Sequence, residues 1–385
     1  MTGVALASAF RLRPLAALAS PREVIRQFTP NWFAATMGTG ILSLTLAQVP
    51  GAPAWTRGLA EGLWGLNIGL FGLFAALYAA RWVMFPGEAR RIFGHALMSM
   101  YFGCIPMGLA TIVNGLLLFG APRWGQAAVE GAQLLWRVDA GLSVACGLAV
   151  PFLMFTRQGH SLEKMTAVWL LPIVACEVAA VTAGLLAPRL ADPADRLQTL
   201  VAGYALWALS VPMALGVLAI LFLRMVAHSL PPVAMAASNW LALGPIGTGA
   251  LGLLVLGGAS PILAGAGLAD VAGAARGVDL IGGLLLWAYG LWWMAMAVMT
   301  TLRYLKGGLP FNLGWWAYTF PLGVFAAATL RLAALLPIPA LTGFAQLLVA
   351  ALAAIWVLVA GRTLAGAWRG ELFSAPCLAE DGVAR

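Results

Sequence analysis

The sequence contains very little charge. Only 9% of its 385 residues are Asp, Glu, Lys or Arg, whereas 62% are hydrophobic and the mean hydropathy is +0.91. Soluble domains average about 25% charged residues, so this composition excludes a soluble globular protein. Because only lipid can surround so much apolar surface, we predict an integral membrane protein.

Clusters of cysteine or histidine are also missing. The four cysteines have no C-x-x-C spacing, and the three histidines stand on separate stretches without an HxxxH or ExxH pair. This pattern argues against a disulfide framework, a zinc site or a di-iron centre. A membrane enzyme would need a nucleophile–base pair or a metal cluster. We therefore expect no metal site, no cofactor and no enzymatic activity.

The net charge of +8 is the one feature that could indicate a nucleic-acid partner. Basic residues beside membrane spans explain it better, so we expect the lipid bilayer and not nucleic acid as the partner. Arg11 and Arg13 interrupt the apolar N-terminus. We therefore interpret this end as a cytoplasmic tail and not as a cleaved signal.

Long apolar runs account for most of the chain. A helix needs about 20 mostly apolar residues to cross a bilayer. By that measure we predict an all-α protein with ten transmembrane helices in five hairpins over 30–366, and cytoplasmic tails at 1–29 and 367–385. The predicted spans are 30–50, 59–84, 95–119, 127–156, 165–188, 198–227, 238–258, 275–303, 312–335 and 342–366.

Lysine and arginine are more frequent before the first span and after the even-numbered spans. Arg22 and Arg26 precede the first span, and Arg90 and Arg91 follow the second, whereas the opposite loops hold fewer basic residues. By the positive-inside rule, both termini should be cytoplasmic. We expect a multi-pass protein of the cytoplasmic (inner) membrane.

Proline is distributed unevenly among the spans. Spans three, five, seven and nine each contain one proline well inside the apolar run: Pro106, Pro172, Pro245 and Pro321. Membrane helices tolerate proline and glycine where neighbours or water satisfy the freed carbonyl groups. We therefore predict that the odd-numbered, kinked helices form an inner ring around a central pore. The alternative is that proline is simply common in membrane helices.

Span one has glycine and hydroxyl residues in place of an internal proline. Thr36, Gly40 and Ser43 recur at helical spacing and so share one face. Such a strip is typical either of the wall of an ion path or of a close helix–helix contact, and the sequence does not distinguish the two. The candidate pore-lining residues of this kind are Thr36, Gly38, Thr39, Gly40 and Ser43, with Gly247 from a second Gly-Thr-Gly sequence in span seven.

Two carboxylates lie inside predicted spans. Glu177 is near the middle of span five, and Asp139 is in span four. A charged group inside a membrane is costly and is therefore a candidate functional site, here for carrying a proton. The structural alternative for Glu177 is a carboxyl group that bridges two helices. Asp139 should need a partner from another helix, whereas Arg276 and Asp279 can pair locally.

Five motifs occur in order along the chain. They are FTPNWFAATMGTGILS (28–43), YFGCIPMGLATI (101–112), VWLLPIVACEVAA (168–180), NWLALGPIGTGALG (239–252) and WWAYTFPLGVF (315–325). Together they closely resemble the tellurite-resistance/dicarboxylate transporter family, which shares a superfamily with the slow-type anion channels of plant guard cells and the fungal malate and sulfite transporters. The resemblance covers essentially all predicted spans. Cys104 and Cys176 depart from the motif pattern without affecting the expected fold.

The resemblance implies a particular architecture and gate. It implies ten helices in five hairpins, kinked odd helices that line a central pore, and a homotrimer in which each subunit conducts. It also implies that the phenylalanine of the YTFP-type motif, Phe320 here, closes the pore. Pro321 would bend the ninth span beside it.

The expected function is membrane transport of small anions, with C4-dicarboxylates such as malate or succinate as the leading substrates. No ring of fixed arginines is expected along the axis, so selectivity would depend on pore width, hydroxyl groups and backbone amides. The alternatives are a proton-coupled carrier that uses Glu177 or Asp139, or an exporter of sulfite or a tellurite-related anion. The sequence does not name the anion.

Overall fold

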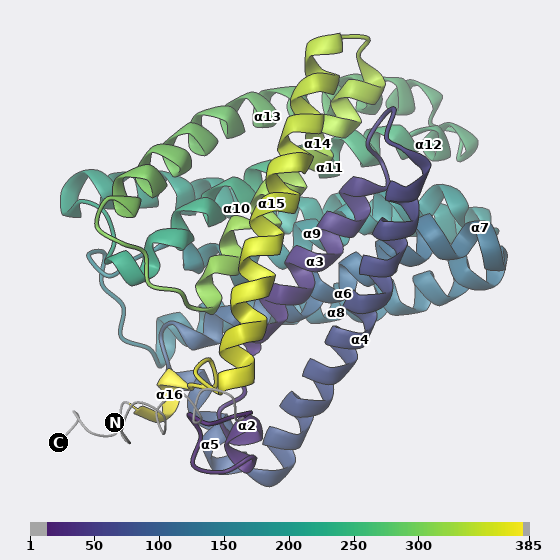
Figure 1. The fold of residues 1–385 in the computed structure, drawn as a ribbon. Coiled ribbons are helices and arrows are strands. Elements are labelled where there is room, and N and C mark those ends of the chain that lie inside the picture. The colour runs from purple at the N-terminus through teal and green to yellow at the C-terminus, as the bar shows by residue number, and fades with distance from the viewer. Residues whose placement is uncertain (1–13, 380–385) are drawn as a thin grey trace.

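The computed structural model describes residues 14–379, and every regular element in that range is a helix. Figure 1 shows the helices packed as one bundle. Nine helices within the described residues are long and apolar enough to cross a membrane. These are Ala54–Met84, Met98–Trp124, Gln126–Thr156, Ala167–Arg189, Pro193–His228, Val233–Gly265, Ala269–Leu305, Leu313–Leu335 and Pro339–Arg369. The prediction of an all-α integral membrane protein is confirmed.

The first predicted span, 30–50, is shorter than the others. It consists of a 3₁₀ turn, η1 (Pro30–Phe33), followed by α3 (Ala34–Leu46). Its core is nevertheless fully enclosed, because every residue from Ala35 to Thr45 is buried. The count of ten spans therefore stays a prediction.

Burial divides the long helices into two groups. In five of them only 17–33% of the most apolar stretch is buried, so their side chains face outward. These outer helices are α4 (Ala54–Met84), α8 (Gln126–Thr156), α10 (Pro193–His228), α13 (Ala269–Leu305) and α15 (Pro339–Arg369). In the other four, 67–89% of that stretch is buried. An apolar face turned outward is what a lipid environment requires.

With η1 and α3 as the first, these four make a set of five buried helices, and each of the five is built from several segments. The second is η3 (Met98–Gly103), α6 (Cys104–Gly115), the π-helical η4 (Leu116–Gly120) and α7 (Ala121–Trp124). The third is η5 (Ala167–Leu170), α9 (Leu171–Leu186) and η6 (Ala187–Arg189). The fourth is η7 (Val233–Ala242), α11 (Leu243–Ala259) and α12 (Pro261–Gly265), and the fifth is η8 (Leu313–Tyr318) and α14 (Phe320–Leu335).

The buried helices contact one another in cyclic order. α3 packs on α6, α6 on α9, α9 on α11, α11 on α14, and α14 returns to α3. Their labels lie together in the middle of Figure 1. The outer helices pack against this set, for example α10 against α9 and α13 against α11. That the five enclose a pore stays a prediction.

The internal prolines lie at transitions from 3₁₀ to α-helix. Pro106, Pro172, Pro245 and Pro321 are the second or third residues of α6, α9, α11 and α14, and each follows a 3₁₀ segment. The backbone amide groups in the first turn of an α-helix have no intrahelical acceptor. A proline there therefore removes no hydrogen bond of the helix. The sequence places these prolines within helices, whereas the structure places them where each α-helical segment begins.

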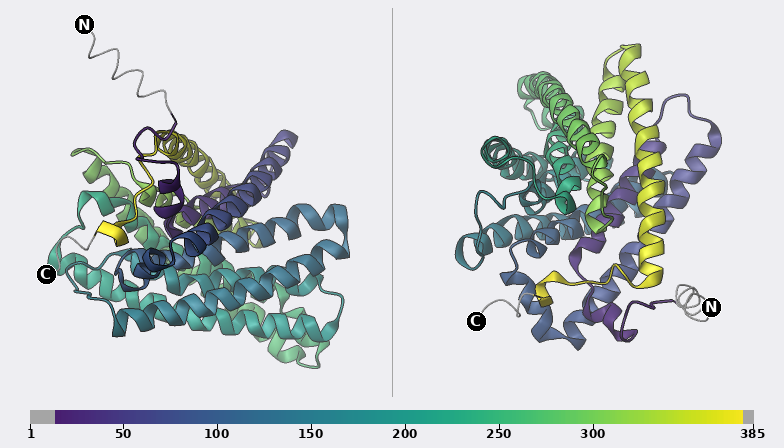
Figure 2. Two further views of the ribbon diagram at one scale, coloured as in Figure 1. Left: turned by 90° about the horizontal axis from the view of Figure 1, so that it is seen from below. Right: turned by 60° about the vertical axis from the view of Figure 1, so that its left-hand side comes forward.

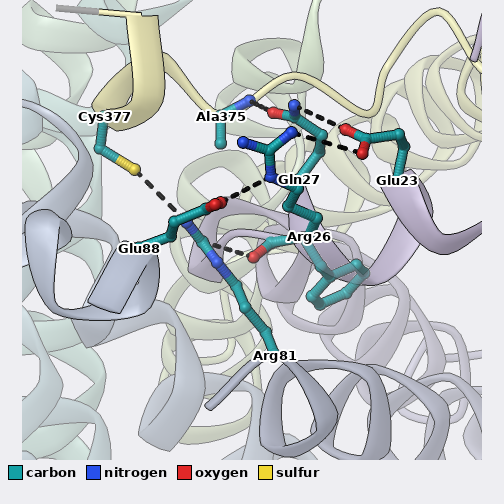
Figure 3. A network of polar contacts seen from close by, with 8 residues as sticks. Glu23, Arg26, Gln27, Arg81, Glu88, Ala375 and Cys377 are labelled. Carbon is teal, nitrogen blue, oxygen red and sulfur yellow. Dashed lines mark hydrogen bonds and ion pairs between the residues drawn. The ribbon is translucent and has the colours of Figure 1, made fainter. Parts of the chain in front are cut away.

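A polar network joins the two ends of the described chain. α2 (Arg22–Arg26) and the segment after α15 lie at the same end of the bundle, beside α5 (Pro86–Arg90) (Figures 1 and 2). Arg26 pairs with Glu88 at 2.7 Å, and the amide of Ala375 donates to Gln27 at 2.8 Å (Figure 3). The ion pair raises the pKa of the Arg26 guanidinium above its usual value. Arg81, which is fully buried, donates to the Phe28 carbonyl at 2.7 Å.

Candidate functional site

Two cavities lie one after the other along the buried helices. The first, of about 50 Å³, is lined by residues near the N-terminal ends of all five, and we call it the N-end cavity. The second, of about 160 Å³, is lined by residues toward the C-terminal ends of the same five, and we call it the C-end cavity. Both cavities therefore follow the line that the five helices share.

Phe320 separates the two cavities. It is the one residue that lines both, and its side chain is only 4% exposed. It is the first residue of α14, and only Thr319 separates it from η8, where the chain changes from 3₁₀ to α-helical geometry. Pro321 also lines the N-end cavity, whereas Pro106, Pro172 and Pro245 line neither cavity.

One face of α3 contributes to both cavities. Ala34 and Met37 line the N-end cavity, and Ile41, Leu44 and Gln48 continue along the C-end cavity. This spacing of three, four and seven residues is that of one helix face. The lining face is therefore mostly apolar, and it differs from the hydroxyl strip that the sequence indicates.

The hydroxyl residues of α3 make contacts within and between helices. Thr36 donates to the Phe33 carbonyl at 2.7 Å, and Ser43 donates to the Ala60 carbonyl of α4 at 2.6 Å. Thr39 accepts a hydrogen bond of 3.0 Å from the indole of Trp356 on α15. None of the three lines either cavity. These contacts fit the helix-contact alternative, and a role of the three residues in the anion path stays a prediction.

The candidate glycines are also sites of close approach between helices. A Cβ at Gly38 would overlap the Thr319 hydroxyl, and one at Gly40 would overlap Thr111 of α6. A Cβ at Gly247 would lie 2.9 Å from the backbone nitrogen of Phe325 on α14. None of these glycines lines the two cavities. They let α3 and α11 approach their neighbours closely, which is a common use of glycine in membrane helices.

The two intramembrane carboxylates lie away from both cavities. Glu177 on α9 and Asp139 on α8 are fully buried, and neither lines the N-end or the C-end cavity. Within the described residues, neither oxygen of Asp139 has a hydrogen-bond partner, whereas the Ser210 hydroxyl of α10 lies beside Glu177. The partner that the sequence leads us to expect for Asp139 is therefore not present there.

The predicted pair of Arg276 and Asp279 has a different arrangement. Asp279 accepts a hydrogen bond of 2.5 Å from the hydroxyl of Tyr204 on α10, and no ion pair with Arg276 forms among the described residues. In a separate contact, Nη2 of Arg137 on α8 lies 3.6 Å from Oδ1 of Asp195 on α10. Both contacts join neighbouring outer helices, α10 to α13 and α8 to α10.

Sequence reasoning missed two arginines. Arg189 and Arg331 line the C-end cavity, although neither was a candidate site residue from the sequence and no ring of fixed arginines was expected along the axis. Arg331 lies eleven residues after Phe320 on α14, and Val324 and Ala327 line the cavity between them. This spacing is helical, so the position of Phe320 in the resembling motif could have indicated Arg331.

The three histidines meet at a third cavity. His95, His160 and His228 line a space of about 660 Å³ together with Lys164 and Arg224. Burial lowers the pKa of His160, which lies in the loop after α8. Among residues 14–379, no group of three or more His, Cys, Asp or Glu side chains could hold a metal ion.

Comparison with known proteins shows the family of this chain. The model of the SLAC1 family, described as voltage-dependent anion channel, matches residues 27–364. The chain is 37% identical to a sulfite efflux pump of Trichophyton rubrum over 91% of this chain and 93% of that protein. It is 30% identical to an uncharacterized transporter of Methanocaldococcus jannaschii over 82% and 86% of the two chains.

A more distant relative is named for a different substrate. The chain is 23% identical to a malic acid transport protein of Schizosaccharomyces pombe, over 87% of this chain and 77% of that protein. The family match covers both cavities and Phe320. The chain therefore belongs to the SLAC1 family of voltage-dependent anion channels and related anion transporters, as its motifs predict.

Proposed function

We propose that this protein carries small anions across a membrane along the line of the N-end and C-end cavities, and that Phe320 is the gate. The observation that carries the proposal is the position of Phe320, the one residue lining both cavities. With that ring between them, the two cavities are separate spaces. A change of the Phe320 side chain from one rotamer to another would join the two cavities, and it needs no movement of the helices.

Sulfite is the anion we propose. Sulfite efflux pumps match at up to 37% identity over nearly the full chain, whereas the malic acid transport protein matches at 23%. This order reverses the expectation of a C4-dicarboxylate, which becomes the second candidate. The C-end cavity of about 160 Å³ has room for several waters or one small oxyanion.

A proton-coupled carrier is the mechanistic alternative. It would use Glu177 or Asp139, but neither side chain lines the two cavities. A proton on either carboxyl group could then affect the anion only through intervening helices. The geometry therefore favours an anion path over proton-coupled exchange at these carboxylates.

The assembly and orientation remain part of the proposal. The family resemblance supports a homotrimer with one path in each subunit. The distribution of Lys and Arg supports cytoplasmic termini in the inner membrane. Chemical crosslinking of the detergent-solubilised protein and protease protection of tagged termini in cells would test these two points.

The gate is tested by sulfite flux into proteoliposomes. Phe320→Leu should increase sulfite flux severalfold, because the smaller side chain leaves the two cavities partly joined. Phe325→Leu is the matched control, since Phe325 is also buried on α14 but lines neither cavity. A parallel measurement with malate and chloride ranks the anions. Unchanged flux in Phe320→Leu, with a folded protein, would refute the gate.

A further inference from the structure

The C-end cavity carries positive charge without a compensating carboxylate. Its lining includes Arg189 and Arg331 but no Asp or Glu. Among residues 14–379, neither arginine takes part in an ion pair with a carboxylate. Both lie toward the C-terminal ends of helices that bound the proposed anion path. An excess of positive charge in a narrow, partly apolar space attracts anions strongly.

Arg331 is held so that its side chain borders this cavity. Its Cα lies on the face of α14 that also carries Phe320, about 16 Å away along the helix axis. On α11, Gly258 leaves room for the guanidinium, because a Cβ there would lie 2.6 Å from Nη2 of Arg331. Glycine at this point lets a long cationic side chain lie between two closely packed helices.

The cavity wall also contains polar groups that lack partners. The hydroxyl of Thr248 and Nε of Arg331 are buried, and neither has a hydrogen-bond partner in the described part of the chain. Oδ1 of Asn114 is likewise buried and has no hydrogen-bond partner among these residues. Thr248 and Asn114 are 1% and 8% exposed, and both line the C-end cavity. Buried polar groups normally have partners, so unpaired ones around a cavity indicate a ligand or water.

The charges nearby do not neutralise the cavity. Arg276, on α13, lies close enough to repel the Arg331 guanidinium. Asp279, on the same helix, is hydrogen bonded to Tyr204 and does not line the cavity. Gln48 adds a neutral amide to the wall. The surroundings therefore leave the positive charge of Arg331 available to a bound anion.

We infer that the C-end cavity is a binding site for one small oxyanion of the sulfite type, and that Arg331 contacts the anion directly. The inference rests on the proposed function, because it assumes that anions follow this path. A guanidinium presents two parallel N–H groups to two oxygens of an oxyanion, which ammonium cannot do. The Thr248 hydroxyl supplies a third donor. Arg189, which is more exposed, increases the local anion concentration.

The test measures sulfite binding and sulfite flux separately. Binding of sulfite to the full-length protein in detergent should raise its melting temperature, because a ligand stabilises the state that it binds. In Arg331→Gln this shift should be lost, and in proteoliposomes the KM for sulfite should rise about tenfold. Arg331→Lys should recover part of the effect, because it keeps the charge but loses the paired N–H groups.

Two further variants make the test specific. Arg276→Gln removes a nearby positive charge that does not line the cavity, so it should change KM far less than Arg331→Gln does and should keep the melting shift. Thr248→Val keeps the size of the side chain and removes its donor, and it should raise KM by a few fold. If Arg331→Gln fails to fold, Arg331→Lys and Thr248→Val carry the test.

The outcomes distinguish this inference from the proposed function. If the wild type carries sulfite and Phe320→Leu increases the flux, but the Arg331 and Thr248 variants keep the wild-type KM and melting shift, the inference is wrong and the gate stands. If sulfite shifts the melting temperature through Arg331 but no anion crosses the membrane, the binding site stands and the transport proposal fails.

Discussion

Replacing Gly40 by alanine tests whether this residue belongs to a helix contact or to the wall of a pore. The added Cβ would overlap Thr111 of α6 and lie 2.7 Å from Nδ2 of Asn67 on α4. The Asn67 amide donates to the Thr111 hydroxyl at 2.9 Å, so the methyl group would enter the point where three helices meet. Either α3 moves away from α6, or this hydrogen bond breaks.

The expected cost follows from three contributions. Overpacking of a tight interior costs about 1–3 kcal/mol. A hydrogen bond between membrane helices contributes about 0.6 kcal/mol on average, and it is lost if Asn67 moves. Alanine gains up to about 1 kcal/mol over glycine in helix propensity. We therefore expect Gly40→Ala to lower the free energy of unfolding by about 1–3 kcal/mol.

Thermal melting in detergent, followed by the loss of monodisperse protein, provides the measurement. Gly65→Ala is the matched control, since it lies on an exposed face of α4 with nothing within 4 Å of the added Cβ. It should be neutral or slightly stabilising. Thr111→Ala combined with Gly40→Ala should recover part of the loss, because it removes the overlapping atom. If Gly40→Ala melts like Gly65→Ala while sulfite flux falls, the helix-contact interpretation is wrong.

Two other predictions concern titratable groups. Glu177→Gln should leave sulfite flux and its response to a pH gradient unchanged, because Glu177 lines neither cavity; loss of the pH response in proteoliposomes would instead support the carrier alternative. Burial lowers the pKa of His160 in the folded protein. The unfolded chain therefore binds a proton at a higher pH than the folded protein does, and the free energy of unfolding should decrease as the pH drops below about 6.5. His160→Gln should reduce the decrease in melting temperature between pH 7.5 and pH 5.5, and an equal decrease in both proteins would contradict this reasoning.

Hydrophobicity and motif order were enough to predict the class of protein and its family. Long apolar runs can be recognised locally, because each span must satisfy its own backbone in lipid. Phe320 could be singled out because its motif resembles one in a known family. The prolines indicated which helices are buried, although they lie in the first turn of each α-helical segment and not in its middle.

Which face of each helix meets the cavities could not be predicted in the same way. On α3 the lining residues are Met37, Ile41 and Leu44, whereas Thr36 and Ser43 contact backbone groups. An apolar helix surrounded by other helices on all sides has no strong amphipathic pattern, so its rotation depends on its neighbours.

The sequence by itself determined that this protein lies in a membrane, that it is helical, and that it has the motifs of an anion transporter family. Only the tertiary structure decided that Phe320 stands between two cavities and that Arg189 and Arg331 share the wall of one of them. The physical reason is distance along the chain. Composition and periodicity act within one helix, whereas a cavity wall is assembled from five helices whose rotations are set by packing.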